Sequence, residues 1–248
     1  MPEPKANAFF TTLSAGGKTV RVKVEIAESK RTKRFCARVV GKDEICLTKP
    51  ARSSRRAALE FLESVAEWAV ARLAEAPEKI SLRRYLSENP RVYAGGFEWR
   101  VWLEKSRTDA FFVEDAKNRE VVFSSPEPDA NGDRLAEAFA EFAAKKICAS
   151  AAAAAEKFGV EYSRISVRNQ SGRWASRSSS GALSFNERML LLPCELQNYI
   201  ICHELAHARF MDHSVSFWIW LGRLCPHAKR LDRELSKLSG KLFAVSLK

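Results

Sequence analysis

Three of the four histidines in the chain lie within one short segment, HELAHARFMDH, which spans residues 203–213. His203 and His207 are four residues apart, so on an α-helix their imidazoles project from the same face, one turn apart. Two imidazoles at this spacing can bind the same Zn²⁺ ion through their ring nitrogens. The segment therefore requires a helix, and Pro193 predicts its start because proline is tolerated in a first helical turn. We expect this helix to run to about Met211.

Two further residues of the segment complete a candidate catalytic zinc site. Glu204 directly follows the first histidine, where a carboxylate can accept a proton from a water that the metal has acidified. His213 lies six residues after His207, beyond the helix, and is the expected third ligand if the chain turns back. Metzincin proteases use the same offset with a glycine at the turn, whereas this chain has Phe210 there and lacks a later methionine. The alternative for His213 is a surface residue beside the helix.

The residues that follow predict a supporting helix. Ser214 is a favourable N-cap for a helix over 215–224. Phe217 and Trp218 of that helix are expected to pack beneath the histidines. The fourth histidine, His227, follows this helix and is interpreted as structural or solvated, and Cys202 is interpreted as a buried thiol.

The N-terminal part of the chain has the alternation of β-strands. Val20, Val22, Val24 and Ile26 share one face, and a period of two is typical of a half-buried strand. Segments 35–40 and 44–48 continue the pattern across a Gly-Lys-Asp turn, so we expect a small antiparallel sheet. A helix over 54–75 and further strands at 97–103, 110–114 and 120–124 are expected to follow.

The middle of the chain supplies a candidate boundary. Segment 126–133 (PEPDANGD) has the composition of a linker, and an alanine-rich helix is predicted over 134–158, ended by Gly159. Short strands are expected at 164–168 and 182–185. Together these patterns predict an α+β fold, with an N-terminal antiparallel β-rich region containing one helix at 1–128 and a catalytic region at 129–248.

Composition and charge restrict the classes of partner. The net charge is +11, and residues 16–58 hold thirteen basic and four acidic side chains, which favours an anionic ligand or nucleic acid as a partner. A need for solubility accounts equally for such a surplus. No apolar stretch approaches the roughly 20 residues that span a bilayer, so no membrane partner is expected. The six cysteines form no CxxC pair and are interpreted as reduced thiols of a cytoplasmic protein.

Two segments of the chain, 173–193 and 198–218, resemble those of a known family. RWASRSSSGALSFNERMLLLP (173–193) and NYIICHELAHARFMDHSVSFW (198–218) resemble the YgjP-like metallopeptidase domain, a family related to the SprT and WLM zincins. The resemblance covers roughly residues 130–240. It implies a zincin-like catalytic part, a peptide or protein substrate, zinc held by His203, His207 and His213, and Glu204 as general base. The matching positions are Arg173-Trp174, Ser176, Asn186, Arg188, Pro193, His203, Glu204, His207, His213-Ser214 and Phe217-Trp218.

Two departures and one charge pattern leave other functions open. The family's usual Cys and Gly in the first segment are replaced by Arg177 and Ala175, neither of which belongs to the expected ligand set. Segment 164–188 contains five arginines and a single acidic residue, Glu187. This excess of positive charge would suit an acidic or phosphorylated ligand, and the alternative is a solvated basic face. Those arginines are Arg164, Arg168, Arg173, Arg177 and Arg188. The alternatives to a zinc peptidase are a metal-dependent nucleotide pyrophosphohydrolase and a DNA-associated SprT-like protease.

Overall fold

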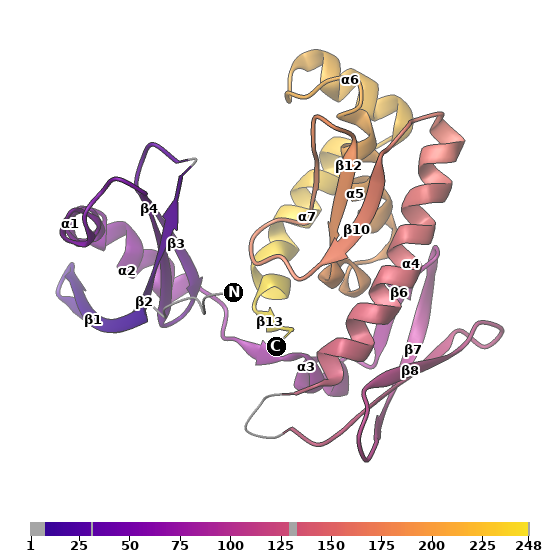
Figure 1. The fold of residues 1–248 in the computed structure, drawn as a ribbon, viewed down its shortest axis with the longest axis horizontal. Helices are drawn as coiled ribbons and strands as arrows, with labels where there is room; N and C mark the ends of the chain where they lie inside the picture. Colours follow the sequence, from indigo (N-terminus) through magenta and orange to yellow (C-terminus); the bar gives the residue numbers. More distant parts are fainter. Residues whose placement is uncertain (1–7, 31, 129–132, 248) are drawn as a thin grey trace. The chain divides into compact units, whose positions relative to one another are not determined.

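The computed structural model describes residues 8–30, 32–128 and 133–247. The chain folds into two compact units, Met1–Lys79 and Ile80–Lys248, each with its own hydrophobic core (Figure 1). Both units contain helices and strands, which is the α+β class that the sequence predicts. Within the described part of the chain, no helix has the length and apolar composition needed to cross a bilayer.

The first unit is a four-stranded sheet with two helices packed on one face. Strands β1 (Ala8–Ala15), β2 (Lys18–Ser29), β3 (Cys36–Gly41) and β4 (Glu44–Pro50) lie in the order β1-β2-β4-β3. The alternation predicted for β2 is confirmed, because Val22, Val24 and Ile26 are buried in the core. This core is closed by helices α1 (Arg55–Ser64) and α2 (Ala66–Glu75).

Two details of this unit differ from the prediction. The sheet is not wholly antiparallel, because the neighbouring strands β2 and β4 are parallel. On its other side β4 pairs with β3 in an antiparallel hairpin, so β4 lies between β2 and β3. The single helix expected over 54–75 is interrupted at Val65, whose φ of −111° and ψ of 16° leave the helical region and whose N–H bonds to Leu62 O at 3.3 Å. Strand pairing is a long-range choice, so local alternation does not determine it.

The second unit contains a sheet of the same strand order. Strands β6 (Arg91–Ala94), β7 (Phe97–Lys105), β8 (Phe111–Asp115) and β9 (Glu120–Ser125) are ordered β6-β7-β9-β8, with β7 and β9 parallel. In both sheets the first hairpin turns on an Ala-Gly-Gly sequence. Gly16, Gly17, Gly95 and Gly96 all have positive φ, which a two-residue hairpin turn of this kind requires at both central positions.

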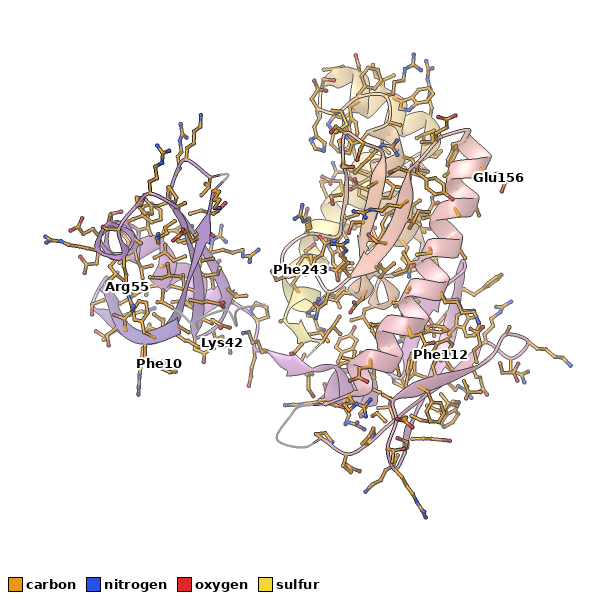
Figure 2. The ribbon with its side chains drawn as sticks, in the orientation of Figure 1. Phe10, Lys42, Arg55, Phe112, Glu156 and Phe243 are labelled. Carbon is orange, nitrogen blue, oxygen red and sulfur yellow. The ribbon has the colours of Figure 1, made fainter. Side chains whose placement is uncertain are left out.

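The boundary between the units lies between residues 79 and 80, whereas the sequence suggests 128/129. The strands β6–β9 belong with helix α4 (Leu135–Phe158) because they share one core. The ring of Phe142 on α4 contacts Trp99, Phe112 and Phe123 of the sheet, with centroids 5.3–5.7 Å apart. Figure 2 shows Phe112 beside this helix. A local change in composition at 126–133 therefore does not mark the end of a core.

Part of the predicted linker, residues 129–132, lies outside the described residues. Asp133 directly after it is held in place: Arg83 donates to its carboxylate from Nε and Nη2 at 2.9 and 2.8 Å. The same carboxylate accepts the Leu135 N–H at 3.0 Å, which assists the start of α4. The long helix ends as predicted at Gly159, which has a φ of 62°.

The remaining elements surround the histidine segment. Strands β10 (Arg164–Arg168), β11 (Ala175–Arg177) and β12 (Ala182–Asn186) form a sheet in the order β10-β12-β11, with β11 at the edge. A 3₁₀ turn, η1 (Glu187–Leu191), then leads to α5 (Cys194–Ala206), α6 (Val215–Leu224) and α7 (Ala228–Phe243). The last strand, β13 (Val245–Ser246), pairs in parallel with β5 (Ile80–Ser81), which is followed by α3 (Leu82–Glu88). Strand β11 was not predicted within its Ser- and Arg-rich surroundings.

Candidate metal centre

Helix α5 presents two of the expected ligands on one face. It begins directly after Pro193, as predicted, but ends at Ala206 rather than near Met211. His207 is the C-cap, and its Nδ1 lies 2.8 Å from the carbonyl oxygen of Phe210. This contact accompanies the turn that follows the helix and explains why the helical periodicity does not continue. The rings of His203 and His207 have centroids 4.9 Å apart.

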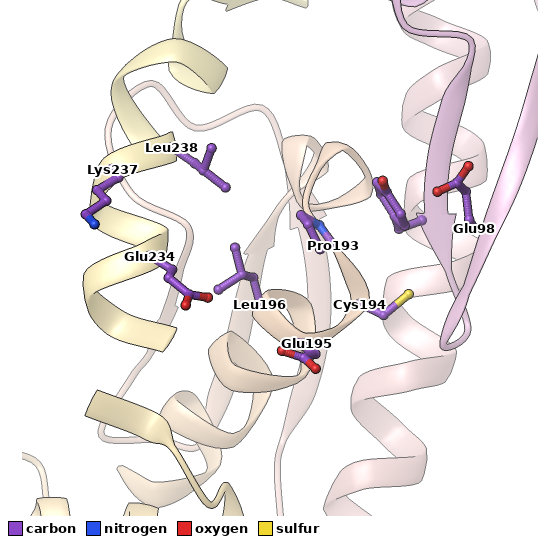
Figure 3. A pocket seen from close by; sticks show the side chains of 9 residues that line it. Glu98, Pro193, Cys194, Glu195, Leu196, Glu234, Lys237 and Leu238 are labelled. Carbon is purple, nitrogen blue, oxygen red and sulfur yellow. The ribbon is translucent and has the colours of Figure 1, made fainter. Parts of the chain in front are cut away.

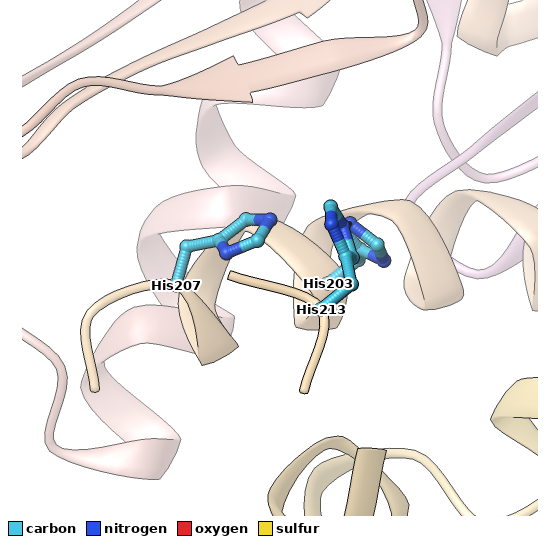
Figure 4. A group of neighbouring side chains, drawn as sticks. All are labelled: His203, His207 and His213. Atoms are coloured by element: carbon cyan, nitrogen blue, oxygen red, sulfur yellow. Dashed lines mark hydrogen bonds between the residues drawn. The ribbon is translucent and has the colours of Figure 1, made fainter. Parts of the chain in front are cut away.

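The turn after α5 brings His213 back to the other two histidines. The Nε2 atoms of His203 and His213 are 3.0 Å apart, and one ring nitrogen from each of the three residues lies within 4.8 Å of the others. Figure 4 shows the three imidazoles gathered at the end of α5 and the loop that follows it. The structure therefore brings together all three histidines that the sequence selects, although Phe210 stands at the glycine position of metzincins.

A buried aromatic ring supports the cluster from below. Phe217 is fully buried, and its centroid lies 4.7–5.0 Å from those of His203, His207 and His213. The ring is stacked on His207 at 27°. Helix α6 spans the predicted residues and is capped as predicted, since Ser214 Oγ accepts the Phe217 N–H at 3.4 Å.

The Nδ1 atoms of two of the imidazoles make hydrogen bonds that fix the orientation of the rings. The Nδ1–H of His207 donates to the Phe210 carbonyl, which leaves Nε2 as the free lone pair. The Nδ1 of His203 lies 3.4 Å from the hydroxyl of Tyr199, and that hydroxyl donates to Asp232 Oδ1 on α7 at 2.8 Å. Sequence reasoning missed Asp232, because an isolated acid 29 residues after His203 carries no recognisable spacing.

Two of the three histidines have the protonation state that a metal requires. Burial, together with the neighbouring histidines, lowers the pKa of His203 to about 4, and burial also lowers the pKa of His207. Metal ligation requires neutral imidazole, so His203 and His207 are already in the ligating form near neutral pH. Three converging imidazoles, two with their second nitrogen engaged, fit a tetrahedral Zn²⁺ that keeps one open position.

Glu204 lies buried beside the cluster, with 6% of its surface exposed. Burial raises the pKa of its carboxyl group to about 7, and a hydrogen bond from the backbone of Arg177 and the charges of Arg177 and Arg173 oppose that rise. Arg177 belongs to β11, so the edge strand meets the carboxylate directly. The position where this chain departs from the family pattern is therefore adjacent to the candidate general base.

Strand β11 is held in place by polar side chains of the neighbouring segments. Asn186 Nδ2 donates to the carbonyls of Gln170 and Arg173 at 2.6 and 2.9 Å, which fixes the loop before β11. Trp174 is a core residue, as expected, with its indole N–H donated to Ser239 Oγ at 2.8 Å and its ring 4.6 Å from that of Phe243.

The five arginines of segment 164–188 do not form one basic wall. Arg188 is buried, and its guanidinium donates to the Val245 carbonyl at 2.8 and 3.0 Å and to Asn169 Oδ1 at 2.7 Å. Arg177 donates from Nη2 to the Glu161 carbonyl at 2.8 Å. Arg188 therefore stabilises the fold by anchoring the last strand. The arginines that the sequence groups together thus include structural residues as well as exposed ones.

The other residues interpreted as structural lie outside the cluster. Cys202 is fully buried, and burial raises the pKa of its thiol to about 12, so it remains protonated. His227 is exposed and begins α7 with a φ of 75°. Both positions agree with their sequence interpretations.

A cavity of about 600 Å³ lies at the opposite end of α5 (Figure 3). Its lining includes Pro193, Cys194 and Leu196 from the start of the helix and Leu238 from α7. Cys194 and His203 are nine residues apart, or about 13 Å along a helix. The cavity is therefore separate from the histidine cluster.

Comparison with known proteins places the chain in a family. No curated protein matches it. The crystal structure of the metallopeptidase zymogen of Pyrococcus abyssi abylysin is similar over 38% of this chain and 95% of that chain, with 28% identity and a TM-score of 0.33. The model of the YgjP-like, metallopeptidase domain family matches residues 33–238, which include every residue of the cluster. The chain thus belongs to the YgjP-like metallopeptidase family.

Proposed function

We propose that the protein is a zinc-dependent peptidase in which His203, His207 and His213 are the metal ligands and Glu204 is the general base. The observation that carries this proposal is the convergence of three imidazole nitrogens within 4.8 Å, with a buried carboxylate on the same helix. Membership of a metallopeptidase family supports it. The catalytic part is accordingly zincin-like, with the HExxH helix at its centre.

Each residue has a distinct part in hydrolysis. Zinc bound there would polarise the scissile carbonyl and acidify a water molecule. Glu204 accepts a proton from the attacking water and later gives it to the leaving amine nitrogen, so the protein ends the cycle in its starting state. The backbone hydrogen bond from Arg177 lowers the pKa of Glu204 and so favours the charged carboxylate that accepts the proton.

The edge strand offers a place for an extended substrate. Trp174 O and Ser178 N bond to β12, so the backbone groups of Ala175 and Arg177 point the other way in the antiparallel ladder. The Arg177 backbone reaches Glu204 on that side. A peptide that adds to this edge would lie beside the general base, which is how strand addition aligns a substrate.

Metal content tests the ligand set. Purified wild-type protein is expected to hold about one zinc ion per chain, and His207→Ala is expected to lose it, because two remaining imidazoles bind zinc far more weakly. Inductively coupled plasma mass spectrometry measures this directly, with His227→Ala as the control that keeps its zinc. Equal zinc content in the wild type and His207→Ala would contradict the assignment.

The substrate class is tested on the same preparations. A quenched fluorescent peptide library is expected to be cleaved by wild type and left intact by His207→Ala. Release of phosphate or pyrophosphate from nucleoside triphosphates, lost in the same variant, would instead support the nucleotide hydrolase that the sequence left open.

Asp232 and Tyr199 are expected to tune zinc affinity through His203. Tyr199→Phe or Asp232→Asn should weaken zinc binding about tenfold, because the hydrogen-bonded partner of a ligating imidazole sets its orientation and basicity. Competition with a chromophoric chelator measures the dissociation constant. Asp232 acts through Tyr199, so adding Asp232→Asn to Tyr199→Phe should weaken binding no further. Glu234→Gln on the same helix is the control. If the double variant loses zinc affinity by the sum of the two single effects, Asp232 does not act through Tyr199.

A further inference from the structure

One end of the sheet in the first unit carries a dense group of exposed basic side chains. Residues 30 and 32–35 of the loop after β2, the turn 51–54 and the first turn of α1 lie at this end: Ala51 N donates to Ser29 O at 3.2 Å, and Cys36 pairs with Thr48 across β3 and β4. Figure 2 labels Arg55 on α1. Among the residues that the structure describes, the exposed basic ones of these three segments are Lys30, Lys33, Arg34, Arg52, Arg55 and Arg56, here called the basic end.

Two hydrogen bonds and one aromatic contact involve the described residues of the loop. The Thr32 N–H donates to Ser29 Oγ at 3.3 Å, and the Thr32 hydroxyl donates to the Arg34 carbonyl at 3.0 Å, which shapes the loop. Phe35 then stacks on Phe61 of α1, with ring centroids 5.5 Å apart. This contact joins the loop to α1, and the guanidinium of Arg55 in the first turn of that helix lies over the Phe9 ring of β1, 4.7 Å from its centroid.

The carboxylates near this end are already engaged. Glu28 accepts Lys49, which lies outside the basic end, at 2.8 Å, and Glu60 accepts Arg56 at 2.9 Å and so offsets one of the six charges. The first turn of α1 contains no acidic residue. Like charges gathered at this density repel one another, which costs stability and produces a strong positive potential. Such a potential favours a partner that carries closely spaced negative charges.

We propose that the basic end binds the phosphate backbone of nucleic acid. Four of its six side chains are arginines, whose planar guanidinium groups bind phosphate oxygens in a bidentate manner. The cations come from three adjacent segments, so they can contact several successive phosphates, and such contacts do not depend on base sequence. This surface lies in the first unit, so its function is independent of the proposed zinc site.

Nucleic acid fits this surface better than an anionic membrane does. The aromatic side chains next to it are half-buried: Phe35 and Phe61 pack on each other, and Phe9 lies under the Arg55 guanidinium. None of the large exposed hydrophobic residues in the described chain lies between 30 and 56. Peripheral binding to a bilayer relies on apolar side chains that enter the interface, in addition to charge.

Fluorescence anisotropy of the full-length protein with a labelled oligothymidylate of about 20 nucleotides tests the proposal. Binding should weaken as salt rises, with a log–log slope of about −0.7 for each phosphate contact. Lys33→Glu/Arg34→Glu should lower the affinity at least tenfold at about 100 mM salt and make the slope shallower. The matched control is Lys18→Glu/Lys42→Glu at the opposite end of the sheet, which changes the net charge equally and should lower the affinity less than about threefold.

Equal loss in the two double variants would overturn the proposal, because it would show a response to net charge rather than to this surface. Absence of binding by wild type would overturn it too, as would preference for phosphatidylserine-containing vesicles over the oligonucleotide. Removal of zinc with a chelator should leave oligonucleotide binding unchanged, which separates this result from the fate of the peptidase proposal.

Discussion

Glu204→Gln is expected to lower peptide hydrolysis by at least about 100-fold while zinc remains bound at about one ion per chain. Glutamine has nearly the same shape and cannot take a proton from water, so the substitution removes the proposed base and keeps the ligands. Its amide oxygen can still accept the backbone hydrogen bond from Arg177 that the carboxylate accepts now. The buried site is therefore expected to keep its structure.

The measurement is kcat on a cleaved peptide from the library, together with zinc content of the same sample. Glu195→Gln is the matched control: it lies in the first turn of the same helix, is exposed, and contacts Arg230 at 3.3 Å. This control should keep wild-type activity. Full activity in Glu204→Gln with zinc bound would exclude Glu204 as the general base.

Phe217→Ala is expected to have the largest effect on stability. Truncating a fully buried phenylalanine costs about 3–5 kcal/mol of unfolding free energy, through lost burial and the cavity left behind. Here the cavity would open directly beneath His203, His207 and His213, whose rings lie within 5.0 Å of it. Zinc affinity should fall as well, because the imidazoles lose the surface that holds them.

Urea unfolding followed by tryptophan fluorescence measures the stability effect, since five of the six tryptophans belong to the second unit. Val215→Ala on the same helix is the control: Val215 is 77% exposed, so its truncation should change stability by less than about 0.5 kcal/mol. Phe217→Leu should fall between the two. If Phe217→Ala unfolds like the wild type, the packing role given to this ring is wrong.

Locally encoded features could be predicted from the sequence. The helix at 215–224 and the strand at 164–168 have the predicted bounds, because a serine N-cap and short alternation are local signals. The histidine cluster could be anticipated in the same way, since two of its members share one helix face. Its geometry also needed the turn at Phe210, for which the chain offers no glycine.

Features that depend on distant pairing could not be predicted. Three such features are the parallel arrangement of β2 and β4, the unit boundary and the Asp232–Tyr199 contact. Each depends on residues that are distant in the sequence and that no local pattern relates. Arg188 is a further example. Its charge suggested a surface residue, whereas it is buried and its hydrogen-bond acceptors are supplied by Val245 and Asn169. Only the tertiary structure reveals that such a guanidinium is satisfied inside the core.

The pairing of β5 with β13 has a consequence for the order of folding. It joins residues 80–81 to residues 245–246, and we expect this contact to form late because closing so long a loop costs entropy. During synthesis, all three histidines leave the ribosome before the strand that completes their unit. A chain that stops short of residue 244 would thus contain every ligand, yet would lack both this closing strand and the carbonyl that satisfies Arg188.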